Sequence, residues 1–203
     1  MPVRFQHDQK ENSFYFITFT CYKWLQLFEM TNGYDAVYKW FGHLYKNNIY
    51  VTGYVIMPNH VHVLLYFPAM PTSLNTLIGN AKRFMAYDII KRLEERKEDN
   101  LLDLLHGAVK KREAKKGQIH KVFEESFDAK EGYSKEFIFQ KLVYMHHNPV
   151  NKKWNLINDF TEYSHSSASF YEKGIKRYEN IIHVNDALSG QLPGSPLTQK
   201  LAQ

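Results

Sequence analysis

The stretch "IYVTGYVIMPNHVHVLLYF", residues 49–67, sets the expected architecture of this chain. Two runs rich in β-branched and aromatic residues flank the dipeptide Pro58-Asn59, which is typical of a turn. The pattern therefore predicts two strands, 49–57 and 60–67, joined as an antiparallel hairpin. The second strand carries two histidines, His60 and His62, inside an otherwise apolar run.

The flanking segments complete an α+β pattern. Residues 13–22 alternate aromatic or β-branched residues with threonine, which predicts a further strand. Apolar residues recur at helical spacing in three other segments, at 32–48, 74–93 and 133–150. The order strand, helix, strand, strand, helix predicts an α+β sandwich: an antiparallel sheet with helices on one face and an extra helix appended.

Length and composition place the chain among single-domain globular proteins. It has 203 residues, of which 44% are hydrophobic, and no apolar stretch approaches the roughly 20 residues that span a bilayer. Cys21 is the only cysteine, so an internal disulfide is excluded, and we expect a cytoplasmic protein without a signal peptide. Residues 1–173 are expected to form one domain, followed by a partly flexible extension at 174–203 whose last part, 189–203, is a loose tail.

The charge distribution is compatible with binding to a polyanion. The net charge is +5, and aromatic residues make up 15% of the chain. Between Lys110 and Lys121, six basic side chains accompany a single acidic one, Glu113. Such a run is most often a solvated surface, and contact with nucleic-acid phosphates is the alternative.

The two histidines form a candidate metal site. Side chains alternate along a strand, so His60 and His62 are expected on one face and Val61 and Val63 on the other. Two neighbouring neutral imidazoles supply half of a divalent-metal site. The simpler alternative is that one ring bonds a backbone carbonyl while the other contacts water.

The helix expected at 133–150 offers further polar groups. Tyr144 and Asn148 are four residues apart and share a helix face, with Gln140 one turn earlier. Pro149 follows directly, which disfavours helical geometry at Asn148. A half-buried core tyrosine and a residue at the helix end are the alternatives. His146 and His147 are expected to be partly exposed.

These residues together resemble a known family. "VIMPNHVHVLL", then "YMHHNPV" about eighty residues later and "EYSHSSASFY" after it, are similar to motifs of the IS200-like single-tyrosine transposases. Within that family the chain most resembles the REP-associated tyrosine transposases, and the match runs from the first strand to about residue 172. The resemblance implies a ferredoxin-like fold with the nucleophile on the appended C-terminal helix.

The resemblance also implies the site and its chemistry. His60, His62 and Asn148 would bind Mg²⁺ or Mn²⁺, and Tyr144 would attack a phosphodiester to give a 5′-phosphotyrosine. The expected partner is single-stranded DNA that contains a hairpin. Basic residues expected to contact this DNA are Lys82, Arg83, Lys110, Lys111 and Arg112. A homodimer with exchanged tyrosine helices and a monomer that acts alone both stay open.

Two other functions remain as alternatives. A domesticated regulator would bind nucleic acid without cleaving it, although it would not need all of His60, His62, Tyr144 and Asn148. A metal phosphoesterase would hydrolyse its substrate with water and would survive loss of the tyrosine.

Overall fold

The computed structural model describes residues 10–193 and contains one four-stranded antiparallel sheet. The strands are β1 (Ser13–Thr20), β2 (Tyr50–Met57), β3 (His60–Phe67) and β4 (Asp128–Gly132), in the spatial order β2-β3-β1-β4. All three neighbouring pairs are antiparallel. The predicted hairpin is confirmed, with Met57 opposite His60 across the turn.

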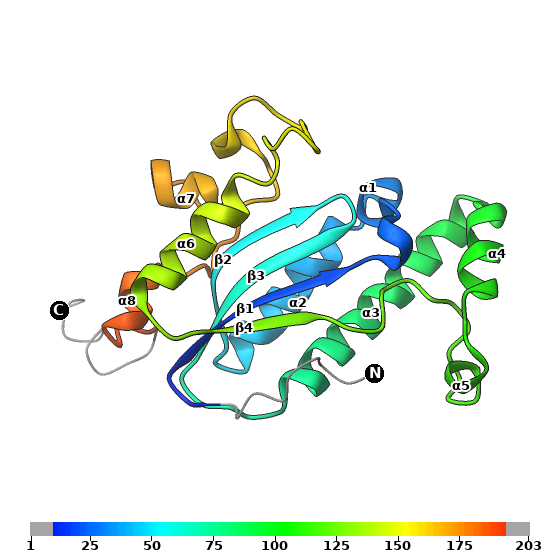
Figure 1. The fold of residues 1–203 in the computed structure, drawn as a ribbon, viewed down its shortest axis with the longest axis horizontal. Helices are drawn as coiled ribbons and strands as arrows, with labels where there is room; N and C mark the ends of the chain where they lie inside the picture. Colours follow the sequence, from blue (N-terminus) through cyan, green and yellow to red (C-terminus); the bar gives the residue numbers. More distant parts are fainter. Residues whose placement is uncertain (1–9, 194–203) are drawn as a thin grey trace.

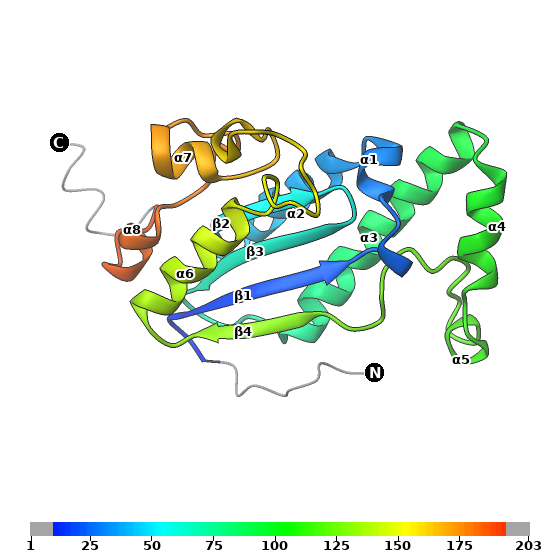
Figure 2. The same cartoon turned by 45° about the horizontal axis from the view of Figure 1, so that its top comes forward.

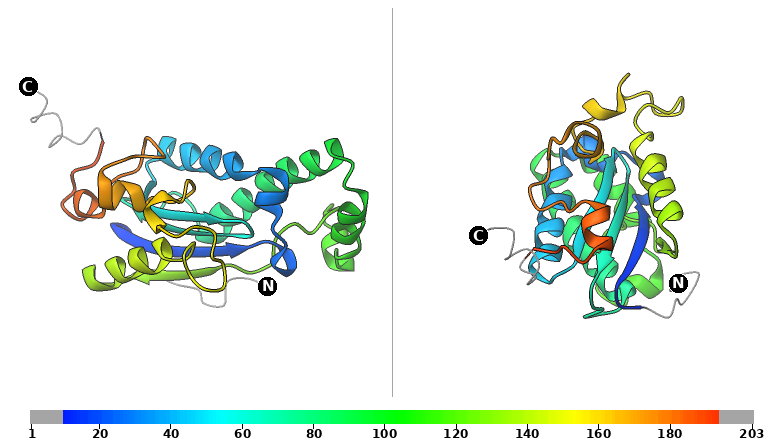
Figure 3. Two further views of the ribbon diagram at one scale, coloured as in Figure 1. Left: turned by 90° about the horizontal axis from the view of Figure 1, so that it is seen from above. Right: turned by 90° about the vertical axis from the view of Figure 1, so that its left-hand side faces the viewer.

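Helices cover both faces of this sheet (Figure 1). On one face lie α2 (Tyr34–Lys46) and α3 (Leu74–Glu95), and on the other lies α6 (Lys135–His146). Figure 3, in its right-hand view, shows the sheet between these two layers. The expectation of helices on one face with a further helix appended therefore needs two corrections. The appended helix fills the opposite face, and it is not the last element of the chain.

The remaining helical elements are short. They are η1 (Tyr22–Trp24), α1 (Leu27–Thr31), α4 (Asp99–Gly107), α5 (Lys111–Ala114), η2 (Phe160–Glu162), α7 (Ala168–Lys173) and α8 (Val184–Leu188). Figures 1 and 2 both place α4 and α5 at the end of the molecule beyond α1, away from α8. None of the helices between residues 10 and 193 is long and apolar enough to cross a bilayer.

Each sheet face has its own hydrophobic core because the strand side chains alternate. Tyr15, Ile17, Val61 and Val63 pack against α2 and α3. The opposite core joins sheet residues to α6 and α8, through residues that include Phe16, Leu64, Ile138, Leu142, Met145, Ile182 and Val184. Burial of each large apolar side chain stabilises the fold by about 1.5–3 kcal/mol, so α6 is an integral layer.

Residues beyond the domain boundary expected at 173 also contribute to this layer. The Ile182 amide donates to the Val51 carbonyl at 3.1 Å, and Val184 and Ala187 are buried beside α6. The tail expected at 189–203 lies mostly outside the described residues, since only residues 189–193 are included.

Two differences from the predicted elements have clear local causes. The helix predicted at 133–150 begins after Ser134, whose hydroxyl accepts the Phe137 amide, and ends at His146, before the pre-proline position 148. Strand β4 has the sequence "DAKEG", which has no apolar alternation to predict it. Pairing with β1 along Phe14 to Thr18 makes it a strand.

Candidate functional site

His60 and His62 lie side by side at the start of β3. Their ring centroids are 4.7 Å apart, and only 3% and 6% of their surfaces are exposed. Both belong to the face that α6 covers, whereas Val61 and Val63 pack against α2 and α3. The predicted alternation along this strand is therefore confirmed.

A hydrogen bond fixes the Nδ1 atom of each ring. His60 Nδ1 lies 2.6 Å from Asn59 Oδ1, and His62 Nδ1 lies 2.7 Å from Thr18 Oγ1. Because an amide oxygen only accepts, His60 carries its proton on Nδ1 and keeps the lone pair on Nε2. Thr18 is the cross-strand partner of His62 in the β1–β3 register. Histidines that bind metals usually have this arrangement, in which one nitrogen is held and the other is left to coordinate.

Burial also keeps both rings neutral. It lowers the pKa of His60 to about 4, with the Lys153 ammonium as a second cause. It lowers the pKa of His62 to about 3, helped by His60 and Lys141. Neutral imidazole is the form that binds a cation, so at pH 7 no proton has to be removed first.

Tyr144 lies next to this pair on α6. Its ring centroid is 5.5 Å from that of His62, at an interplanar angle of 67°. Its side chain is 53% exposed, so a substrate can reach the phenol. The ring of Phe16 stacks on His62 and meets Tyr144 edge-on, and the Lys141 ammonium lies 5.7 Å from the Tyr144 centroid.

Two glycines allow α6 to approach the sheet closely. A Cβ atom at Gly53 would come within 2.3 Å of Leu142 Cδ2, and one at Gly132 would come within 2.9 Å of Ile138 Cγ1. The last turn of α6 is then fixed by a polar contact. His146 Nε2 lies 2.8 Å from the hydroxyl of Ser167, and both side chains are buried. The expectation that His146 is partly exposed is therefore wrong.

Ser167 connects α6 to the edge of the sheet. Its hydroxyl accepts the Tyr54 amide at 2.9 Å and donates to the Tyr54 carbonyl at 3.2 Å. These roles leave the hydroxyl oxygen to accept from His146 Nε2–H, so the Ser167 hydroxyl both donates and accepts. The motif "SHSSAS" thus holds the helix turn that carries Tyr144.

Asn148 lies in the turn after α6. Its amide nitrogen donates to the Tyr144 carbonyl at 3.1 Å, which leaves the amide oxygen as the group that could meet a cation. Between residues 10 and 193, no three His, Cys, Asp or Glu side chains gather as a metal site. The structure therefore brings the two imidazoles together, and Asn148 as their third partner stays a prediction.

The basic residues expected to contact DNA occupy different surroundings. The Lys82 ammonium donates to the carbonyls of residues 124–126, and burial lowers its pKa to about 8. These contacts hold the loop before β4, and contact of Lys82 with DNA stays a prediction. The Arg83 guanidinium lies 5.0 Å from the ring of Phe84.

The other three basic residues lie near α5, at one end of the molecule. Lys110 and Arg112 form ion pairs with Glu125, and Lys111 is exposed. Surface ion pairs of this kind contribute little to stability, and they leave Lys110 and Arg112 near the surface.

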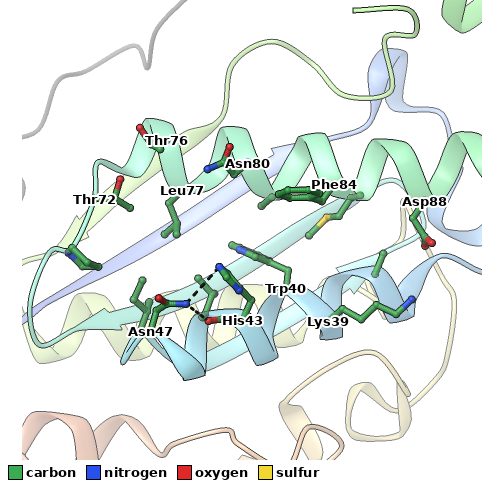
Figure 4. Close-up of a pocket in the computed structure, with 16 residues that line it drawn as sticks. Lys39, Trp40, His43, Asn47, Thr72, Thr76, Leu77, Asn80, Phe84 and Asp88 are labelled. Carbon is green, nitrogen blue, oxygen red and sulfur yellow. Dashed lines mark hydrogen bonds between the residues drawn. The ribbon is translucent and has the colours of Figure 1, made fainter.

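A cavity of about 680 Å³ lies on the opposite side of the sheet from the histidines. Figure 4 shows it between α2 and α3, with Trp40, Leu77 and Phe84 among its apolar walls. Neither histidine lines this cavity, so the candidate site and the cavity are separate features of the fold.

The fold is an α+β domain whose four-stranded antiparallel sheet brings a histidine pair and an exposed tyrosine together. A solved structure with a similar fold is described as a REP-associated tyrosine transposase bound to a REP hairpin. It matches with a TM-score of 0.59 over 86% of this chain and 89% of its own, at 12% identity. No protein-family model and no curated protein matches the sequence. The resemblance expected from the motifs is thus confirmed at the level of the fold.

Sequence reasoning missed several residues around the site. Asn59 was interpreted only as a turn residue, and Thr18 and Phe16 only as strand residues. The roles of Thr18 and Phe16 come from the register between β1 and β3, which no local pattern encodes, whereas Asn59 bonds its own sequence neighbour, His60. A histidine pair in an apolar strand is itself a signal that polar partners should be sought on the neighbouring strand.

Proposed function

We propose that this chain is an IS200-like single-tyrosine transposase or nickase that cleaves and rejoins single-stranded DNA. The single observation that carries the proposal is the 5.5 Å contact between the rings of Tyr144 and His62 within one chain. The fold shared with a transposase that was solved with hairpin DNA supports the same assignment.

The proposed reaction begins when the Tyr144 hydroxyl attacks a backbone phosphorus. The new Oη–P bond forms as the P–O3′ bond breaks, the phenol proton passes to solvent, and the departing 3′ oxygen takes up a proton. The products are a 5′-phosphotyrosine and a free 3′-hydroxyl. Because the ester retains the bond energy, a second 3′-hydroxyl can attack it and release Tyr144.

The donor set fits a divalent cation. His60 and His62 would hold Mg²⁺ or Mn²⁺ through Nε2, together with Asn148, and the bound ion would polarise a phosphate oxygen as a Lewis acid. Asn59 and Thr18 orient the two imidazoles for this task. Lys141, with its ammonium beside Tyr144, adds positive charge where the phosphate would lie.

The geometry favours a reaction within one chain. Tyr144 and the histidines of the same chain are already neighbours, and the glycine contacts and the His146–Ser167 pair hold α6 against its own sheet. Exchange of tyrosine helices between two copies would require these buried contacts to break.

A denaturing gel tests the proposal. Labelled DNA hairpins with randomised single-stranded flanks are incubated with the protein and Mn²⁺, and a covalent protein–DNA band is expected. Tyr144→Phe should abolish the band, whereas Tyr133→Phe, which alters a tyrosine that is 78% exposed near the start of α6, should not.

The same gel separates the alternatives. Free cleaved strand that persists in Tyr144→Phe would indicate a phosphoesterase that uses water. Neither a covalent band nor a cleaved strand in this gel, together with hairpin binding in a native gel, would indicate a domesticated regulator.

A further inference from the structure

Trp24 is an exposed aromatic side chain beside the histidine pair. Its indole is 54% exposed, and its ring centroid lies 5.8 Å from that of His60. Large aromatic side chains are normally buried, so an exposed one next to a candidate active site suggests contact with a ligand.

The backbone that presents this indole is in an unfavourable conformation. Lys23 and Trp24 have φ values of 49° and 59°, in the left-handed region that non-glycine residues rarely adopt. Two consecutive residues in this region persist only when their surroundings hold them, and such strain concentrates at functional sites. Here the Lys23 amide donates to Glu124 Oε1, and the Trp24 carbonyl accepts from Asn59 Nδ2, each at 2.9 Å.

The Asn59 side chain forms hydrogen bonds with both His60 and Trp24. Its amide oxygen accepts from His60 Nδ1, and its amide nitrogen holds the Trp24 carbonyl. Asn59 itself is buried, so this link is a fixed part of the fold. The position of the indole is thereby tied to the orientation of a candidate metal ligand.

The ammonium of Lys153 lies next to the Trp24 indole. Lys153 Nζ lies 4.8 Å from the Trp24 ring centroid and 5.5 Å from that of Trp154, whose own ring lies 5.5 Å from His60. Lys153 is exposed, and within the described part of the chain no carboxylate pairs with it. An aromatic face with an adjacent ammonium matches the two parts of a nucleotide, a base and a phosphate.

We infer that Trp24 and Lys153 form a subsite for one unpaired nucleotide next to the scissile phosphate, with its base stacked on the indole and its phosphate at the ammonium. This inference rests on the proposed function and adds to it a position for the single strand at the His60 side of the site. The same strand would then pass over the histidine pair and contact Lys141, whose ammonium lies next to Tyr144.

Binding of two short probes tests the subsite. One is a thymidine octamer, and the other is an octamer of abasic nucleotides with the same number of phosphates. Both are titrated by fluorescence anisotropy in the Tyr144→Phe background without divalent metal. Trp24→Ala should weaken binding of the thymidine octamer by roughly 5- to 150-fold, as expected when one base–aromatic stack is lost. Binding of the abasic octamer should change by less than about 2-fold, because phosphate contacts are untouched.

Three further variants make the result specific. Trp24→Phe should retain most of the thymidine preference because it keeps an aromatic face. Lys153→Ala should weaken both probes equally and reduce the salt dependence of binding by about one phosphate contact. Tyr87→Ala removes an aromatic side chain that is 64% exposed on α3 and should change neither affinity. Melting temperatures of all variants show whether each one is folded.

Two results would overturn the inference. One is a Trp24→Ala variant that binds the thymidine octamer as tightly as its parent. The other is an equal loss for both probes, which would mean that the indole acts only on the local fold. Since neither probe is cleaved in this assay, its outcome is independent of whether the covalent band forms.

Discussion

Replacement of Ser167 by alanine should loosen the turn that carries Tyr144. The Ser167 hydroxyl has three polar neighbours, His146 Nε2 at 2.8 Å and the Tyr54 amide and carbonyl at 2.9 and 3.2 Å. All of these groups are away from solvent, since Ser167 is 1% exposed, His146 4% and Tyr54 0%. Alanine would therefore leave an imidazole N–H and an amide N–H without a partner.

Each unsatisfied buried group costs about 1–3 kcal/mol, so we expect the two groups left unpaired by Ser167→Ala to lower the free energy of unfolding by about 2–6 kcal/mol. For a chain of 203 residues this corresponds to a drop in Tm of roughly 4–24 °C. Ser169→Ala is the matched control. Its buried hydroxyl donates only to the Ile175 carbonyl at 3.0 Å, so its removal should cost about 1 kcal/mol.

Urea unfolding of the two variants measures these costs, and the covalent-band assay measures their effect on chemistry. At a temperature where both are folded, Ser167→Ala should form the Tyr144 adduct more slowly while it binds hairpin DNA normally. In a double-mutant cycle, His146→Phe and Ser167→Ala should show a coupling energy of about 1 kcal/mol or more. Additive effects of the two substitutions, or adduct formation at the parental rate, would refute this role for the pair.

Three further predictions concern the histidines and the packing of α6 against the sheet. Burial holds the pKa values of His60, His62 and His146 at about 4, 3 and 3, below 6.5 for an unperturbed imidazole, so the unfolded state binds more protons below pH 6.5. The contribution of these histidines to the free energy of unfolding should be fully present above pH 6.5 and should fall toward pH 4 by up to about 1.4 kcal/mol per pH unit for each histidine. Urea unfolding at several pH values measures this change. Thr18→Val should weaken Mn²⁺ binding by about 10- to 100-fold in calorimetry, because it removes the partner of His62 Nδ1. Gly53→Ala should lower the free energy of unfolding by about 1–3 kcal/mol and slow adduct formation, because its Cβ would push α6 outward.

Each of these predictions has its own contrary outcome. His146→Phe should reduce the acid dependence, and an unchanged slope would mean that His146 is not a buried neutral imidazole. Thr52→Val, which removes a buried hydroxyl of strand β2 that donates to the Leu64 carbonyl, should leave metal binding intact, so equal losses in both variants would point to a general effect on the sheet. Gly42→Ala, where a Cβ has open space, should be harmless, and a Gly53→Ala variant of equal stability would contradict the close approach of α6.

The amino-acid sequence predicts the sheet and helices wherever a local period is strong. The β2–β3 hairpin, α2, α3 and α6 have continuous apolar patterns, and their type and approximate bounds could be predicted. Strand β4 could not be predicted, because its five residues owe their conformation to pairing with β1. The side of the sheet that α6 covers also could not be predicted, since it depends on close contacts at Gly53 and Gly132 that are distant in sequence.

Some residues of the candidate site could be predicted from the sequence and others could not. Strand alternation was enough to place His60 and His62 on one face, and the motif resemblance singled out Tyr144. Thr18 meets His62 through the β1–β3 register and Ser167 meets His146 through the tertiary fold, so neither contact could be deduced from spacing, whereas Asn59 is the sequence neighbour of His60. The contacts of Lys82 with three backbone carbonyls likewise could not be deduced from spacing, because its partners are more than forty residues away in the sequence.

The most direct test locates the covalent bond itself. The protein is incubated with labelled hairpin DNA and Mn²⁺, digested with a protease, and the nucleotide-bearing peptide is sequenced by mass spectrometry. The proposed function predicts a nucleotide 5′-phosphate on Tyr144, and no such peptide from the His60→Ala/His62→Ala variant. An adduct on any other residue, or an undiminished adduct when both histidines are absent, would contradict it.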